Sequence, residues 1–245
     1  MRKLALLVLS MFATSLVVAQ NTTATTASSD EGQVVALPKT DWLTPFTDVK
    51  VSGPINVVFK HVATPEEGRI TYDTKGWLTS KFKAEIDKDG LLTIEEKSDP
   101  KRTTVTDVTV YYSTLRKVKI VQAKAEFQDV MERDMLDVEV TGGAVVSMNV
   151  DVFDLAVYCT GRSLLTLSGA TKYMNMKVST AKVDGAKLNT TASIVDASHG
   201  AEVRINVSER LEATSSTSAK LLYKGSPRIL RDHTALFGGD IIDID

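Results

Sequence analysis

The chain has 245 residues, and its 29 Lys and Arg nearly balance its 31 Asp and Glu. No basic run stands out, so the charge pattern gives no indication of nucleic-acid binding. The length suits one large β domain or two ordinary ones, and a single cysteine, Cys159, excludes an intramolecular disulfide while leaving an intermolecular one open.

Residues 1–19 are predicted to be a secretory signal peptide. Arg2 and Lys3 precede an apolar run that ends in Val17-Val18-Ala19, and cleavage is expected after Ala19. The run contains Ser and Thr and is marginal for a membrane span, which needs about 20 apolar residues. We therefore expect an exported protein with no transmembrane span after cleavage.

Residues 20–40 are rich in Thr, Ser and Ala and predict a disordered linker. The sequons at Asn21, Asn189 and Asn206 are interpreted as chance matches unless the host glycosylates asparagine.

Residues 41–114 predict an N-terminal β region that forms a head and the first strands of a larger β structure. Apolar residues alternate on both sides of Gly53-Pro54, and Asp87-Lys88-Asp89-Gly90 separates two alternating runs, which predicts a hairpin. We expect this region to cover an edge that would otherwise pair with another molecule. Trp42 and Trp77 lie here, and each is interpreted as a packing residue rather than a sugar platform.

Residues 115–227 repeat a short pattern: Ser or Thr, two residues, Ala or Ser, one residue, and a large apolar residue. A fixed period near twenty residues is typical of a solenoid, whose units bury their apolar faces only by stacking. The first positions of the copies, which include a weak one at Gln122 and a shortened one at Ser179, are separated by 19, 19, 19, 19 and 18 residues: Gln122, Thr141, Thr160, Ser179, Ser198 and Ser216.

Apolar residues alternate before and after each Ser or Thr, which predicts strands with one inward face. Two short strands per rung, with a turn at the Ser or Thr, describe a parallel β-helix with rungs of about 19 residues. An antiparallel meander needs tight turns such as Asn-Gly, and leucine-rich repeats need an Asn ladder; the region has neither. Residues 228–245 are predicted to be a C-terminal cap over the last rung. The residues expected to face inward before each turn include Leu136, Val138, Val140, Leu155, Val157, Cys159, Met174, Met176, Val178, Ser193, Val195, Ala197, Leu211, Ala213 and Ser215.

No residue set in the sequence predicts catalysis, a metal site or a cofactor. The Ser/Thr column is expected to hydrogen-bond locally, and His61, His199 and His233 lack metal-ligand spacing. Four aspartates fall at different offsets within their rungs, so they are not expected to form an acid/base pair: Asp151, Asp154, Asp184 and Asp196. The tail acids Asp240, Asp243 and Asp245 have no calcium-loop spacing, although cation binding there stays open.

The order of parts resembles a bacterial family described as putative auto-transporter adhesins with a head GIN domain, common among secreted Bacteroidetes proteins. The resemblance rests on the stretch from Phe46 to Val57, the turn from Asp89 to Ile94, the repeats, and the closing stretch from Tyr223 to Pro227. It implies a right-handed single-stranded β-helix on an exported protein located in the periplasm, on the outer-membrane surface or outside the cell. The family's Ser-Gly-Ala-Ser turn survives here only as Thr141-Gly142-Gly143-Ala144 and Ser198-His199-Gly200-Ala201.

Three functions follow as hypotheses. The first is a non-catalytic binding or adhesion module that recognises an unknown protein or glycan of the cell envelope or surface. The second is a carbohydrate-active β-helix enzyme, which rests on architecture alone. The third is a periplasmic structural protein that associates with itself.

Overall fold

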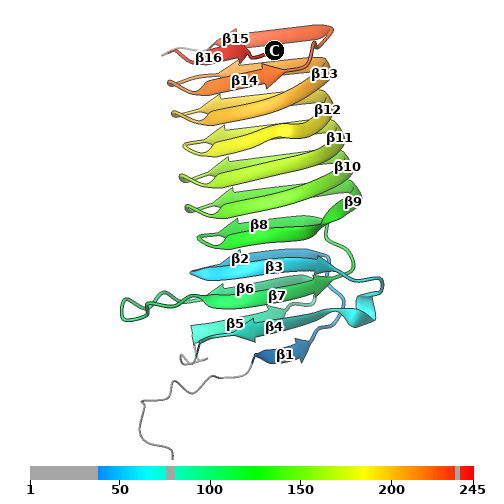
Figure 1. Cartoon of the computed structure of the whole chain (residues 1–245), viewed down its shortest axis with the longest axis vertical. Coiled ribbons are helices and arrows are strands. Elements are labelled where there is room, and N and C mark those ends of the chain that lie inside the picture. The colour runs from blue at the N-terminus through cyan, green and yellow to red at the C-terminus, as the bar shows by residue number, and fades with distance from the viewer. Residues whose placement is uncertain (1–37, 76–80, 235–237) are drawn as a thin grey trace, which may run out of the picture. The chain divides into compact units, whose positions relative to one another are not determined.

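Figure 1 shows a computed structural model of the chain, which describes residues 38–75, 81–234 and 238–245. These residues form an all-β solenoid in which sixteen strands belong to one continuous hydrogen-bonded sheet. The predicted signal peptide, most of the predicted linker and Trp77 lie outside the described residues. No helix in the described part of the chain is long and apolar enough to cross a membrane.

The predicted repeats form a stack of parallel rungs. From Val145 opposite Leu164 to Thr160 opposite Ser179, the β10–β11 ladder keeps a constant offset of 19 residues, so the sequence period is the rung length. Each rung is one long strand that bends in the middle, where two short strands were expected. The five strands are β9 (Lys124–Thr141), β10 (Val145–Thr160), β11 (Leu164–Ser179), β12 (Lys182–Ser198) and β13 (Glu202–Ser215).

Four of these strands end at a Ser or Thr of the repeat pattern, and the next residue has a positive φ. Gly142 and Gly161 both have φ 71°, which glycine adopts without steric cost. Thr180 and His199 hold φ 54° at the same place with a side chain attached. The turn is therefore kept where the glycine of the family pattern has been lost.

The inward columns predicted from the alternation are buried, from Leu136 in β9 to Ser215 in β13. Val157 is 4% exposed and Cys159 is fully buried, as expected, whereas Lys177 between the inward positions is exposed. One continuous apolar core runs from Phe46 to Tyr223. The rungs thus bury one face of every strand, and this burial is what holds so long a ladder together.

The head continues the same ladder. Its strands are out of chain order: β2 (Asp48–Ser52) lies between β6 (Leu91–Glu96) and β8 (Lys117–Val121), and β3 (Ile55–His61) lies between β7 (Thr106–Tyr112) and β9, all in parallel. In the described part of the head, three strands are antiparallel to their neighbours and cover this end: β1 (Lys39–Trp42), β4 (Arg69–Asp73) and β5 (Phe82–Ile86).

The predicted hairpin around Asp87-Lys88-Asp89-Gly90 is confirmed. β5 and β6 pair around Gly90, whose φ is 76°. A short 3₁₀ turn, η1 (Pro65–Glu67), precedes β4.

The interpretation of Trp42 as a packing residue is wrong. Its side chain is 70% exposed, and the guanidinium carbon of Arg69 lies 5.7 Å from the centroid of its ring.

The C-terminal tail forms a last partial rung and does not close the stack. β14 (Lys220–Lys224) and β15 (Ile229–Thr234) both pair with β13, and β16 (Asp240–Asp243) pairs with β14, all in parallel. Every residue of β15 is exposed. The tail therefore satisfies the edge of the rung below it, while its own outer edge has no partner strand in the described part of the chain.

Candidate binding surface

The outer face of the second half of the rungs carries side chains in straight columns, because the ladder places equivalent residues opposite one another. Asp137, Ala156, Asn175 and Ile194 stand in register along one column. The column two residues earlier contains Met135, Asp154, Tyr173, Ala192 and Arg210. Small residues in both columns leave room between the larger ones.

A hollow of about 410 Å³ opens at this place, which we call the sheet hollow. Its walls include Met135, Tyr173 and Ile194, which are 63%, 43% and 52% exposed. Ala156 and Ala192 contribute to its lining. Exposed apolar side chains that gather around a concavity are typical of interaction sites, whereas single ones are ordinary.

Two aromatic rings and a lysine form a ridge beside the sheet hollow. Phe153 and Tyr173 meet edge to face, with ring centroids 5.3 Å apart and an interplanar angle of 74°. Lys172 Nζ lies 5.0 Å from the Phe153 centroid and 5.5 Å from the Tyr173 centroid. Cation–π attraction of this kind fixes the lysine without neutralising it. We call Phe153, Lys172 and Tyr173 the aromatic ridge.

A second hollow, of about 680 Å³, lies on the other side of the ridge, where the rungs bend. We call it the corner hollow. Ala170 stands between Asp151 and Asn189 in its column, and its small side chain leaves a recess between theirs. Asn206 Nδ2 donates a hydrogen bond of 2.8 Å to Asn189 Oδ1, and Phe153 and Lys172 also line the hollow.

Hydroxyl groups beneath the corner hollow are engaged within the protein. Thr190 Oγ1 donates to the carbonyl of Asn206 at 2.7 Å and lies 2.8 Å from Ser193 Oγ. Ser208 Oγ donates to the carbonyl of Thr190 at 3.2 Å, and Thr171 Oγ1 donates to the carbonyl of Tyr173 at 3.0 Å. These bonds hold the bent part of the rungs in place.

Residues 45–227 match the family described as putative auto-transporter adhesin, head GIN domain. The chain belongs to this family. Crystal structures of two family-like proteins share its fold: a putative adhesin from Bacteroides fragilis (TM-score 0.77, 16% identity) and one from Parabacteroides merdae (TM-score 0.64, 17% identity), each covering 85% of this chain and 96% of its own.

A crystal structure of a putative lipid binding protein from Parabacteroides distasonis is also similar, with a TM-score of 0.59 and 14% identity over 84% of this chain and 96% of that one. A search of curated proteins gives no match. At these identities the solved structures show the fold.

The four aspartates considered as a possible acid/base pair, Asp151, Asp154, Asp184 and Asp196, lie in four different columns of the ladder. Asp154 lines the sheet hollow and Asp151 the corner hollow, whereas Asp184 stands opposite Arg204 and Asp196 opposite Lys177. Their different offsets in the sequence thus correspond to different columns in the ladder. The offsets did not show that Glu132 stands directly opposite Asp151, with both side chains exposed.

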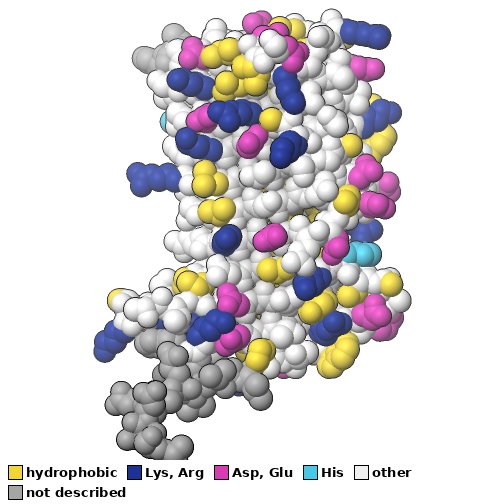
Figure 2. All heavy atoms as spheres, in the orientation of Figure 1, with side chains coloured by type: hydrophobic (Ala, Val, Ile, Leu, Met, Phe, Trp, Pro, Cys, Tyr) yellow, Lys and Arg dark blue, Asp and Glu magenta, His cyan; other side chains and the backbone are white. Residues whose placement is uncertain are grey.

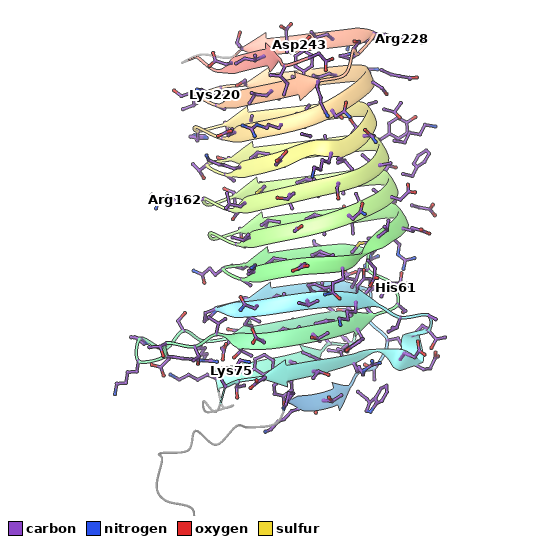
Figure 3. All side chains as sticks on the ribbon, viewed as in Figure 1. His61, Lys75, Arg162, Lys220, Arg228 and Asp243 are labelled. Carbon is purple, nitrogen blue, oxygen red and sulfur yellow. The ribbon has the colours of Figure 1, made fainter. Side chains whose placement is uncertain are left out.

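The histidines and the Ser/Thr column do not line either hollow, although His61 and Arg133, which lines the corner hollow, contact the same Ser113 carbonyl. Figure 3 shows Arg162 at the edge that carries the rung turns and His61 at the opposite edge of the molecule. His61 Nε2 lies 3.1 Å from the Ser113 carbonyl, and His199 Nδ1 lies 3.3 Å from Ser179 Oγ. Among the described residues, no group of three or more His, Cys, Asp or Glu is placed to hold a metal ion.

The aromatic ridge was not predicted from the sequence, although a signal for it was present. Once the alternation is known, Met135, Phe153, Tyr173 and Ile194 all occupy outward positions where polar residues are the rule. Large apolar residues at outward positions of successive rungs are a reason to expect a binding surface.

Proposed function

We propose that the chain is an exported, non-catalytic binding module of the cell envelope that attaches to a surface component through the aromatic ridge and the two hollows beside it. The observation that carries this proposal is the ridge itself. Phe153 and Tyr173 are 47% and 43% exposed, one on each side of a lysine, between two concave regions. Aromatic residues in such settings supply much of the energy of binding sites.

The scaffold favours binding because it is rigid. The strands that carry the ridge, β10 and β11, are hydrogen-bonded on both sides over most of their length. Side chains on such a ladder are already in place before a ligand arrives, so little conformational entropy is lost on binding. The family description as an adhesin supports an exported location, and the proposal places the module in the periplasm, on the outer-membrane surface or outside the cell.

The surface charges support a specific contact over a broad electrostatic one. Figure 2 shows positive and negative side chains interspersed with apolar ones over the visible face. A mixed surface of this kind does not attract one sign of charge over long distances.

The carboxylates at the ridge support a non-catalytic role. Glycoside hydrolysis needs two carboxyl groups about 5–10 Å apart, and one of them usually sits in an apolar setting that keeps it protonated. Glu132 and Asp151 adjoin in the ladder, but both are exposed to water. The family is described as an adhesin and not as an enzyme.

The test is binding of the purified mature protein, residues 20–245, to immobilised cell-envelope and host-surface preparations. We expect Tyr173→Ser and Ile194→Ser each to weaken binding by about tenfold, which corresponds to about 1.4 kcal/mol. Leu164→Ser is the matched control, because Leu164 is a similarly exposed side chain on the first half of β11. Equal weakening by the control, or no binding by the wild type, would contradict the proposal.

The same preparation tests for catalysis. We expect no new reducing ends from pectin, alginate or glycosaminoglycans, with or without calcium. Turnover that is abolished by Asp151→Asn or Glu132→Gln would overturn the non-catalytic assignment in favour of a carbohydrate-active enzyme.

A lipid ligand is a second candidate, favoured by the apolar walls of the sheet hollow and by the description of the Parabacteroides distasonis relative. Co-sedimentation with phosphatidylglycerol vesicles that is lost in Ile194→Ser and kept in Leu164→Ser would support it.

A further inference from the structure

We propose that the corner hollow is a carbohydrate-binding site, which takes a sugar chain bearing carboxylates. This inference rests on the binding function proposed above and names the class of ligand. A volume of about 680 Å³ falls within the range of about 300–1,000 Å³ typical of small-molecule sites. The hollow spans β9 to β13, so a ligand there would run along the stack across several rungs.

The position of the hollow disfavours a peptide bound in extended form. Such a peptide usually adds a strand to an open sheet edge and gains its affinity from backbone hydrogen bonds. At the corner, β11 already pairs with β10 on one side and with β12 on the other. Recognition must therefore come from side chains that project from the ladder.

The polar side chains around the hollow match the hydroxyl groups of a sugar. The Asn189 amide is oriented by the bond from Asn206, and its amide nitrogen makes no hydrogen bond within the described residues. Asp151 stands two rungs away in the same column, with Ala170 between them. One column thus offers a donor and an acceptor about 10 Å apart, at about 4.8 Å per rung, and the gap between them is open.

The aromatic ridge matches the other surface of a sugar. A pyranose ring has an apolar face of C–H groups and a polar rim, so it binds well where an aromatic side chain adjoins hydrogen-bonding groups. Phe153 lines the hollow together with Asn189 and is nearly half exposed. The hollow therefore offers both kinds of contact at once.

The charges favour an acidic sugar over a neutral one. The residues that line the hollow include two cations, Arg133 and Lys172, and one carboxylate, Asp151, which give a formal charge of 2 − 1 = +1. Glu132 and Asp134 adjoin the end of the hollow that holds Asp151 and Arg133, so the positive charge that a ligand meets lies at the Lys172 end. Lys172 makes no salt bridge within the described residues and is held over the rings of the ridge. Its ammonium group is therefore available to a ligand carboxylate.

The experiment is calorimetric titration of the mature protein with two defined probes, hexagalacturonate and maltohexaose. We expect the acidic hexamer to bind more tightly than the neutral one. Lys172→Gln and Asn189→Ala should each weaken the acidic hexamer about tenfold. Lys177→Gln is the matched control, because this exposed lysine lies on the same strand outside the corner hollow and should leave affinity unchanged.

The proposal is overturned if the wild type binds neither hexamer, or if Lys177→Gln weakens binding as much as Lys172→Gln. A parallel arm separates this failure from failure of the binding function. If the protein still binds envelope preparations after periodate has cleaved their vicinal diols, and loses that binding after protease treatment or lipid extraction, then the module binds a protein or a lipid and the sugar inference falls alone.

Discussion

Individual side chains inside the solenoid are confined from above and below as well as from the sides. Val157 in β10 stands between Val138 and Met176 in its column, and the neighbouring rungs are only about 4.8 Å away. A charged side chain placed there can neither reach water nor find a partner. Outward side chains on the same strands meet solvent directly.

We therefore expect Val157→Asp to cost several kcal/mol of unfolding free energy, enough to threaten folding. Lys177→Asp, on the exposed face of β11, should cost under about 1 kcal/mol. Thermal and urea melts of both variants measure the difference. Equal losses would contradict the difference in burial between the two positions, and a larger loss for Lys177→Asp would show that the two faces have been assigned the wrong way round.

Cys159 is a buried thiol in the column of Val140 and Val178. Burial raises its pKa from 9.0 to about 12. The thiol stays protonated up to a higher pH in the folded state than in the unfolded state. Its contribution to stability is therefore intact below pH 9 and is lost as the pH rises towards 12.

We expect the native protein to react slowly with a thiol reagent at neutral pH, and Cys159→Val to lose less stability between pH 9 and 12 than the wild type. Denaturant melts across this range measure the second effect. Fast labelling of the native protein, or a dimer that disappears on reduction, would contradict the burial.

At the scale of the strand, the backbone in the middle of β11 approaches the neighbouring rung closely. Gly169 in β11 has φ +105°, and a Cβ atom there would lie 2.0 Å from the carbonyl oxygen of Val150 in the preceding rung, β10. Gly143, in the turn after β9, has φ +82°, but a Cβ there would meet nothing within 4 Å.

These two glycines make a matched pair. Gly143→Ala should lower the free energy of unfolding by about 1–2 kcal/mol, because a residue with a Cβ atom is strained in the left-handed conformation. Gly169→Ala should cost clearly more, because the backbone of β10 must also move. Urea melts measure both. Equal costs would show that the bend tolerates displacement of the neighbouring rung.

The strands differ in how far the sequence could predict them. The repeat strands were predictable because a period of two fixes the inward face, and a period of 19 fixes the partner. The head was not: β2 and β3 lie beside β8 and β9, with β6 and β7 on their other side, and no repeat indicates such long-range pairing. The period also places Ala170 between Asp151 and Asn189, each 19 residues away, but only the structure shows that a small side chain there leaves a hollow.

At the scale of the molecule, the two ends of the solenoid differ. The head end is covered by the antiparallel strands β1, β4 and β5, whereas β15 and β16 leave an open parallel edge (Figure 1). An open edge is a template for pairing with another chain. The open edge would therefore allow two copies to associate unless side chains on the last rung prevent it.

The last rung carries two carboxylates in inward columns. Asp232 stands opposite buried Ala213, and Asp243 stands opposite buried Tyr223. Figure 3 shows Asp243 on this final rung. A second copy stacked on the edge would have to bury both charges, and inward-pointing charges are a known way for proteins to block edge pairing.

We expect the mature protein to be monomeric at neutral pH, and the double variant Asp232→Leu, Asp243→Val to associate. Two open C-terminal edges related by a two-fold axis form a closed dimer, so association should stop at two copies. Asp240→Val is the control, because Asp240 lies on the same strand at an outward position opposite Lys220 and should leave the protein monomeric. Sedimentation equilibrium measures the masses. A wild-type dimer at neutral pH would mean that the inward carboxylates do not block stacking, and would favour a structural role built on self-assembly.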